Sequence, residues 1–334
     1  MNSWRSIRSK ILTPNVSATM LDVRGFHKKS PAAQELLEKI GSTFLTGYGY
    51  AAEARSPAAA EDRLEEIPSQ FRGFCYEGAG MGFAMLDALP FGDGHDNIAR
   101  FLGGRGNDHI YMVYVGIGWA MARLPRFRWP KIAPLDPLLR WLVLDGYGFH
   151  QAYFHTDRYV TKQFQDPGFR WADGPASYPN RVIDQGIGRA MWFVGGTDAE
   201  LVATMIDRFP ESRRSDLYSG AGLAATYAGG AGEAELRLFG QRAGIHRPQV
   251  ALACAFAAEA RVRAGLVMPN TEMAAEVFCG MTAHDAARLT QDVRPTGPVA
   301  GELPAFEVWR ERIANEFVSP PTSSHTESPS EAKS

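Results

Sequence analysis

The stretch YMVYVGIGWAMARL, residues 111–124, decides between two folds. An apolar start followed by a Gly-X-Gly pair is typical of a strand that runs into a dinucleotide-binding turn. The third glycine of that fingerprint is replaced by Met121, so the match is only partial. The rest of the chain must therefore decide whether these glycines contact a phosphate or another helix.

Glycine pairs of the same form recur along the chain, whereas a nucleotide-binding fingerprint is a single feature of its domain. The second glycines follow one another at intervals of 30 to 40 residues, near the repeat of about 34 residues of a tetratricopeptide hairpin. The positions four and one before them are apolar or aromatic, except Asp184, and share a helix face with the glycine. Because glycine destabilises a helix by about 1 kcal/mol relative to alanine, the pairs indicate close helix crossings. They are Gly47/Gly49, Gly78/Gly80, Gly116/Gly118, Gly146/Gly148, Gly186/Gly188 and Gly220/Gly222.

The C-terminal half predicts helical hairpins most clearly. A helix over residues 181–194 ends at two glycines, and a second helix starts after Asp198 and ends before Pro210. Residues 215–228 open a similar unit, and no segment shows sustained alternation, so residues 111–115 are the only plausible strand. The pattern predicts an all-α fold, a helical-hairpin repeat array resembling a tetratricopeptide-like α-solenoid.

We expect a single helical-repeat domain over residues 30–317. An N-terminal extension (1–29) precedes it and a disordered tail (318–334) with few apolar residues follows it. Irregular insertions near 124–137 and 164–180 interrupt the array. Each either covers a site or packs against the end of the solenoid, and the sequence leaves both readings open.

Composition limits the classes of partner. The chain has 334 residues, of which 45% are hydrophobic, enough for a sizeable core. Its net charge of −2 comes without a single-sign block, so neither nucleic acid nor a membrane is an expected partner. No secretory signal and no 18-residue apolar span are found, and we expect a cytoplasmic protein. Cys75, Cys254 and Cys279 are expected to be reduced core thiols.

Fixed positions around the packing glycine face the concave surface in helical-hairpin solenoids. In this chain those positions are largely aromatic, with a few polar groups. Such a lining is typical of a pocket for a flat apolar molecule, although each aromatic side chain can also belong to the core between repeats. The predicted binding residues are Trp119, Tyr147, Phe149, Tyr153, Gln185, Trp192 and Arg123.

Two carboxylates stand in apolar surroundings, Glu77 in FCYEGAGMGF and Asp145 in WLVLDGYGF. A buried carboxylate needs a partner or a raised pKa, so each is either paired with Arg189 or Arg123 or acts as a general base. No HExxH, CxxC, Walker or G-x-S-x-G motif occurs, and the nearest histidine is five residues from His150, so we expect no metal and no cofactor. The catalytic candidates are Glu77, Asp145, Arg189 and His150.

Several strings resemble those of a bacterial family that is labelled as a domain of unknown function and accompanies enediyne antibiotic gene clusters. The resemblance spans about residues 11–317 and implies a role in enediyne biosynthesis. In anthraquinone-fused pathways it implies joining the anthraquinone to the enediyne core by a carbon–carbon bond. The implied partner is a polycyclic aromatic or enediyne small molecule, and no catalytic assignment comes with it. The strings are LTPNVS, VRGFH, FCYEGAGMG, YMVYVGIGWAMARL, LDPLLRWLVLDGYGFHQAYF and QGIGRAMWFVGG.

Two hypotheses of different classes follow. Coupling to a phenolic ring needs a base, for which Glu77 or Asp145 is suited, and a donor for developing negative charge, such as Arg189 or Tyr147. The alternative is a non-catalytic solenoid that binds or sequesters an intermediate or scaffolds pathway enzymes. A deep pocket with buried carboxylates favours the enzyme, and an open groove with only paired charges favours the scaffold. The oligomeric state, a homo-oligomer included, is left open.

Overall fold

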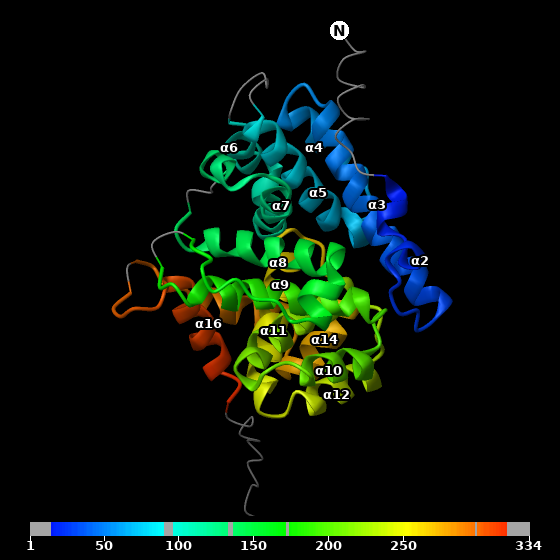
Figure 1. Cartoon of the computed structure of the whole chain (residues 1–334), viewed down its shortest axis with the longest axis vertical. Helices are drawn as coiled ribbons and strands as arrows, with labels where there is room; N and C mark the ends of the chain where they lie inside the picture. Colours follow the sequence, from blue (N-terminus) through cyan, green and yellow to red (C-terminus); the bar gives the residue numbers. More distant parts are fainter. Residues whose placement is uncertain (1–14, 90–95, 133–135, 172–173, 298, 319–334) are drawn as a thin grey trace, which may run out of the picture.

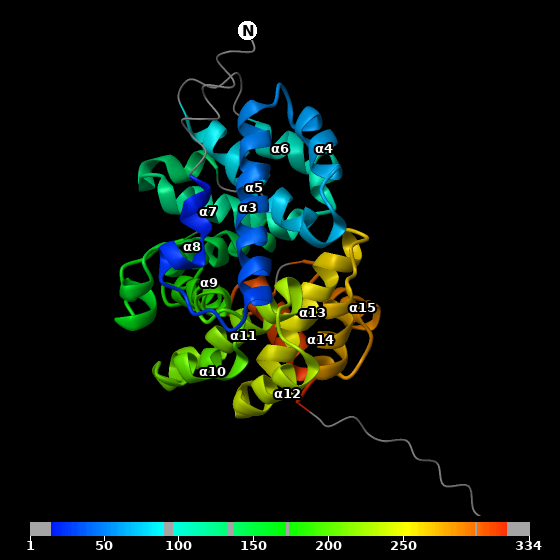
Figure 2. The ribbon, with the colours of Figure 1, turned by 90° about the vertical axis from the view of Figure 1, so that its right-hand side faces the viewer.

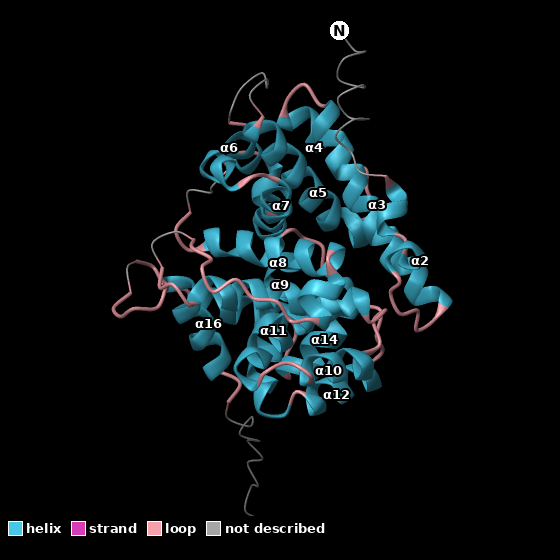
Figure 3. Ribbon diagram, viewed as in Figure 1, coloured by secondary structure: helices cyan, strands magenta, loops and turns pink. Residues whose placement is uncertain are grey.

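The structure is a computed structural model that describes residues 15–89, 96–132, 136–171, 174–297 and 299–318. Within these ranges the regular elements are helices and no strand occurs (Figure 3), which confirms the all-α class. Residues 111–115 lie inside α7 (Ile110–Arg123), so the one plausible strand is helical. The predicted disordered tail lies outside the described residues except for Val318.

Long helices form one row in which each packs against the next along the chain (Figure 1). The row ends with α15 (Ala283–Asp292), which packs against the last long helix, α13. Helices that are distant in the sequence are therefore related through a chain of neighbours. The long members are α3 (Pro31–Glu53), α5 (Ser69–Ala88), α7, α8 (Leu142–Phe154), α9 (Tyr178–Val194), α11 (Glu211–Ala228) and α13 (Arg247–Arg263).

Shorter helices lie between long ones in both halves of the chain, whereas only 3₁₀ and π turns separate α7, α8 and α9 among the described residues. In the C-terminal half, α10 (Ala199–Asp207) packs against α12 (Glu233–Arg242), and α12 packs against α14 (Pro269–Cys279), as Figure 2 shows. The N-terminal half has α4 (Pro57–Glu65) and α6 (Asn97–Leu102) against α5, and α16 (Ala305–Asn315) packs on α13. Among the described residues, no helix is long and apolar enough to cross a bilayer.

Capping residues begin the helices close to where the sequence predicts. The Asp198 side chain accepts a hydrogen bond from the Leu201 amide at the start of α10, and Gly195 ends α9. Pro210 was expected to end a helix, and it does follow α10, but it is also the N-cap of α11. Because proline tolerates a helix start, α11 begins four residues before the predicted residue 215.

The glycine pairs are helix crossings, as predicted. A Cβ on Gly116 would lie 2.1 Å from the carbonyl oxygen of Glu77 on the preceding long helix, and one on Gly118 would lie 2.0 Å from that of Val143 on the next. One glycine of a pair thus faces each neighbour. Any larger residue would force the helix backbones apart, so repetition of the pair fixes the spacing of the row.

The described residues of the expected N-terminal extension pack against the helical domain. Here η1 (Val16–Thr19) and α2 (Leu21–Arg24) lie along α3 (Figure 2). Leu21 is 1% exposed, and the His27 amide donates to the Val194 carbonyl at the end of α9. Short apolar segments of this kind have no helical periodicity, so their burial was not visible in the sequence.

Buried ion pairs fasten neighbouring helices. Arg213 on α11 donates two hydrogen bonds to Asp184 on α9, at 2.9 and 2.6 Å, and both side chains are almost completely buried. Asp184 occupies the predicted packing face, where it was the single polar exception. Its pairing with an arginine of the next helix explains why a carboxylate is tolerated there. The cysteines form no disulfide, as expected, although Cys279 is only partly buried.

Candidate functional site

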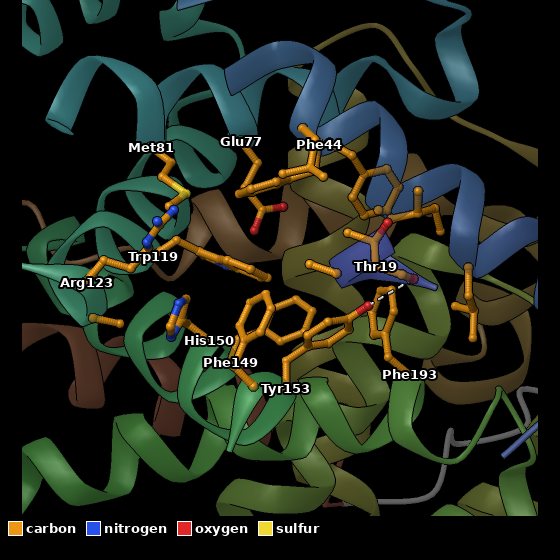
Figure 4. Close-up of a pocket in the computed structure, with 18 of the residues that line it drawn as sticks. Thr19, Phe44, Glu77, Met81, Trp119, Arg123, Phe149, His150, Tyr153 and Phe193 are labelled. Atoms are coloured by element: carbon orange, nitrogen blue, oxygen red, sulfur yellow. Dashed lines mark hydrogen bonds between the residues drawn. The ribbon is translucent and has the colours of Figure 1, made fainter. Parts of the chain in front are cut away.

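A cavity of about 430 Å³ opens between α3, α5, α7 and α8, with η1 at its edge (Figure 4). This volume falls in the range of about 300–1,000 Å³ typical of small-molecule sites. We call it the aromatic cavity, because rings dominate its walls. It is lined by Ala18, Thr19, Leu37, Ile40, Gly41, Phe44, Leu45, Phe74, Glu77, Met81, Trp119, Ala122, Arg123, Phe149, His150, Tyr153, Phe154, His155 and Phe193.

Glu77 points into this cavity from α5 (Figure 4). Its side chain is 2% exposed, and its Oε1 atom has no hydrogen-bond partner among the described residues. Burial raises the pKa of Glu77 to about 7; the Arg189 charge opposes this rise and the Asp145 charge adds to it. The Trp119 indole N–H lies close enough to favour the charged form, but makes no hydrogen bond of normal geometry. Glu77 can therefore give or take a proton near neutral pH.

Aromatic rings pack against one another and form a continuous wall of the cavity. The Trp119 ring lies 4.6 Å from that of Phe44 and 5.1 Å from that of Phe149, measured between centroids. Tyr153 continues this wall, and its hydroxyl donates to the Thr19 carbonyl at 3.4 Å (Figure 4). Flat faces and edges at these spacings suit a planar aromatic ligand, since offset and edge-on ring contacts are the favourable ones.

Two basic side chains lie at the other end of the cavity from Phe193. His150 is 8% exposed and its Nδ1 atom has no partner among the described residues. Burial, together with the smaller effects of the Arg123 and His155 charges, lowers the pKa of His150 to about 3. The imidazole is therefore neutral, with one nitrogen as donor and the other as acceptor. Arg123 is exposed beside it and forms no ion pair with any described residue.

Asp145 and Arg189 lie behind the aromatic cavity and are paired with each other. Arg189 Nη1 donates to Asp145 Oδ1, and both side chains are at least 95% buried. They line a second, inner cavity of about 50 Å³ together with Gln185. The Arg189 guanidinium lies 5.1 Å from the centroid of the Phe149 ring, on the side away from the ligand space. The sequence left ion pair and base open for both acids; the geometry makes Asp145 the paired one and leaves Glu77 unpaired.

Three predicted binding residues do not line the aromatic cavity, and one of them is Gln185, which lines only the inner cavity. Tyr147 lies on a different face of α8 and lines a third cavity, described below, instead of the aromatic one. Trp192 is 0% exposed, and its indole N–H donates to the Gly229 carbonyl at 2.9 Å. It lines none of the three cavities and belongs to the core. Tyr147 directly precedes Gly148, outside the inward-facing positions, and rotation by about 100° per residue places it on another face of the helix. Trp192, four residues after Gly188, was expected to face inwards, but its indole N–H is bound to the Gly229 carbonyl in the core.

The sequence analysis missed the contribution of the N-terminal part. Phe44 lines the cavity, whereas Thr46, which counting three residues back from Gly49 places on the inward face, does not. The reason is a register shift: a Cβ on Gly47 would lie 1.9 Å from the Cys75 carbonyl oxygen, so Gly47 is the glycine that contacts the next helix. Counting three residues back from Gly47 gives Phe44, at the position that Glu77 occupies in α5. Thr19 had no signal, because it was assigned to an extension.

The predicted insertions do not line the aromatic cavity where they are described. Phe169 from the second insertion is 1% exposed and packs on Trp129 from the first, with ring centroids 5.7 Å apart. Parts of both segments, residues 133–135 and 172–173, lie outside the described residues. Within the described part of the chain, no group of three or more His, Cys, Asp or Glu side chains is arranged to hold a metal ion.

Residues 3–317 match the family described as "protein of unknown function (DUF1702)". The chain belongs to this family. No curated protein and no solved structure matches it. The family description names no activity, so a function for the chain has to be argued from the cavity and the groups that face it.

Proposed function

We propose that the protein is a cofactor-independent enzyme of enediyne biosynthesis that binds a planar polycyclic intermediate in the aromatic cavity and modifies it by acid–base chemistry. The observation that carries the proposal is Glu77, a buried and unpaired carboxyl that faces a cavity of about 430 Å³ walled by aromatic rings. Buried, unpaired carboxyls are rare outside functional sites, because burial without a partner destabilises the fold. The resemblance of its sequence strings to the enediyne-associated family supplies the pathway.

The reaction we favour is carbon–carbon coupling. Glu77 as carboxylate takes the proton of a phenol, and the resulting phenolate attacks an electrophilic carbon of the partner group through a ring carbon. The new bond displaces an electron pair from the electrophilic carbon onto the oxygen that this carbon carries, and that oxygen takes a proton. The attacking ring carbon then loses its hydrogen as a proton, which restores the aromaticity of the phenol ring. The step involves no net oxidation or reduction, so it needs no redox partner.

Other residues of the cavity orient and polarise the reactants. Trp119 and Phe149 hold the planar ring, which converts an encounter into an aligned reaction. The neutral imidazole of His150 can donate one hydrogen bond, and Arg123 can stabilise negative charge that develops on oxygen. Arg189, predicted as the donor to the ligand, instead donates to Asp145. Its positive charge acts on Glu77 by lowering the pKa of that carboxyl.

We also propose that the row of helices is a helical-hairpin repeat array of the tetratricopeptide-like kind, because long helices packed side by side with shorter ones beside them are typical of such arrays. We propose a cytoplasmic location, where the pathway's intermediates are made. A rigid row of helices would present the cavity without rearrangement, and it leaves the oligomeric state open.

The test is incubation of the purified protein, without metal or nucleotide, with extract of a producing strain that lacks the gene. Mass spectrometry should show loss of precursors and a product whose mass equals that of the coupled compound. Glu77→Gln should lose at least a hundredfold in rate, in line with the loss of a general base. Asp207→Asn, which alters a carboxylate on α10 far from the cavity lining, should keep the wild-type rate.

The alternative function is a non-catalytic solenoid that sequesters an intermediate or scaffolds pathway enzymes. It predicts that an intermediate co-purifies with the protein unchanged and that Glu77→Gln binds it as well as the wild type does. Full activity of Glu77→Gln on the natural intermediate would exclude the acid–base proposal.

A further inference from the structure

The third cavity, of about 290 Å³, lies on a different face of α8 from the aromatic cavity. Tyr147 and Gln151, one helical turn apart, face it, whereas Phe149 and Tyr153 face the aromatic cavity. The helix therefore separates the two spaces. They meet at its C-terminal end, where His155 lines both. We call the third cavity the polar cavity.

The polar cavity is rich in hydrogen-bond donors. Arg126 pairs with Asp166 at 2.8 Å, so the charge of that acid is already balanced. Arg158 also lines the cavity; its guanidinium lies 3.8 Å from the centroid of the Phe164 ring and forms no ion pair with any described residue. The arginines thus outnumber the acid, and a net positive charge is left facing the space. Arg158 is held flat on an aromatic face, which leaves its N–H edges free for a carboxylate.

The mouth of the aromatic cavity also carries a positive charge without an ion-pair partner among the described residues. Arg123 lies at that mouth and is likewise without an ion pair among the described residues. His155 is exposed between the two spaces. The last carbonyls of α8 do not oppose an anion here, because the Thr156 hydroxyl donates to the Ala152 and Tyr153 carbonyls, at 2.8 and 3.2 Å.

The backbone around the polar cavity is unusual and firmly held. The chain leaves α8 through a π-helix, η5 (Asp157–Thr161), a conformation that is frequent at functional sites. Gln163 follows with a φ of +54°, which a non-glycine side chain rarely adopts. Arg213 donates to the Gln163 carbonyl at 2.7 Å, and the Gln163 side-chain Nε2 donates to the Arg208 carbonyl at 2.9 Å. These two bonds hold the strained residue, and the Phe164 amide donates to the Arg158 carbonyl at 3.0 Å beside it.

We propose that the polar cavity is a second subsite, which takes a negatively charged, oxygen-rich arm of the ligand whose planar part occupies the aromatic cavity. The class of group is a carboxylate, bound by Arg158 and reached around the end of α8 past His155. This inference rests on the proposed function for the planar part. It adds that the natural substrate is an acidic amphiphile, not a neutral polycycle.

The test compares two synthetic ligands by calorimetry. Both are the same tricyclic phenol with a short flexible chain; one chain ends in a carboxylate and the other in a primary amide. We expect the wild-type protein to bind the carboxylate about tenfold more tightly, the ratio that one added charged hydrogen bond supplies. Arg158→Gln should remove this ratio and leave the affinity for the amide unchanged. The control is Arg237→Gln on α12, which removes an arginine paired with Glu233 and should change neither affinity.

The outcomes separate the two proposals. Equal binding of both ligands by the wild type overturns the subsite and leaves the aromatic cavity standing. A ratio that survives Arg158→Gln and disappears in Arg123→Gln also overturns it, because the carboxylate then stays at the mouth of the aromatic cavity. If neither ligand binds, the proposed function fails and the subsite fails with it. Circular dichroism of each variant shows whether it has folded.

Discussion

Replacing Glu77 by glutamine should make the protein more stable while it removes the proposed activity. Glutamine has the shape of glutamate and cannot ionise. The folded protein holds Glu77 in a site that disfavours its charge, and the pKa rises from the ordinary 4.5 to about 7. The unfolded chain ionises at the ordinary value. Between these two values the unfolded state loses a proton that the folded state keeps, so the stability of the wild type falls as the pH rises.

The magnitude follows from the shift. One pKa unit corresponds to about 1.4 kcal/mol, so the shift from 4.5 to about 7 destabilises the wild type by about 3 kcal/mol at pH 8. At pH 5, where the folded protein keeps Glu77 protonated and only the unfolded chain ionises, the destabilisation is about 1 kcal/mol. Because Glu77 is almost fully buried, solvent screens little of this effect. The unfolding free energy of Glu77→Gln should thus exceed that of the wild type by about 3 kcal/mol at pH 8. The difference should vanish well below pH 4.5, where Glu77 is neutral in both the folded and the unfolded state.

Urea unfolding of both proteins at pH 5 and pH 8 measures these differences. Glu307 provides the matched control, since Arg310 and Arg181 outweigh its burial and lower its pKa. Glu307→Gln should therefore destabilise the protein at pH 8, opposite in sign to Glu77→Gln. The reasoning is refuted if Glu77→Gln is less stable than the wild type at pH 8, or if its advantage does not grow between the two pH values.

Three further predictions concern the packing and the electrostatics. Gly116→Ala places a methyl group 2.1 Å from the Glu77 carbonyl oxygen and should prevent folding. The control is Gly240→Ala on α12, where the nearest packing atom, on Phe278, is 3.7 Å away; this variant should raise the stability by up to about 1 kcal/mol in thermal unfolding. Asp184→Asn leaves Arg213 buried without its anion and should cost about 3–5 kcal/mol in urea; an unchanged midpoint would contradict the pair. His150, with a pKa of about 3, should show no imidazole titration by NMR between pH 5 and pH 8.

Much of the fold could be predicted, because the glycine pairs carry a local physical demand. A helix tolerates a glycine such as Gly116 or Gly118 only where it gains a close neighbour, so repetition of the pair indicated a row of crossing helices. Eleven of the twelve residues assigned to the packing face are buried, Tyr147 being half-buried. The start of the chain could not be predicted in the same way, since η1 and α2 are too short to show periodicity and their burial depends on contacts distant in sequence.

The candidate site was predicted in part. Glu77, Trp119, Phe149 and Tyr153 were placed in one inward-facing column, and they do line one cavity. Which of the two acids is paired was undecidable, because Glu77 and Asp145 occupy the same position relative to the glycine pair of their helices, α5 and α8. The pairing is decided by Arg189, which lies on α9, the long helix after that of Asp145. Which acid its guanidinium reaches depends on side-chain geometry that the sequence pattern does not contain. The polar cavity on the far face of α8 had no signal, since it depends on an irregular loop folding back against the helix.

The measurement that tests the central claim most directly is a crystal structure of the protein with a planar tricyclic phenol. The account predicts that the ring lies in the aromatic cavity against the wall that Trp119 and Phe149 form, with its phenolic oxygen within hydrogen-bonding distance of the Glu77 carboxyl. A ligand bound elsewhere, or a ring in the cavity whose oxygen points away from Glu77, would contradict it.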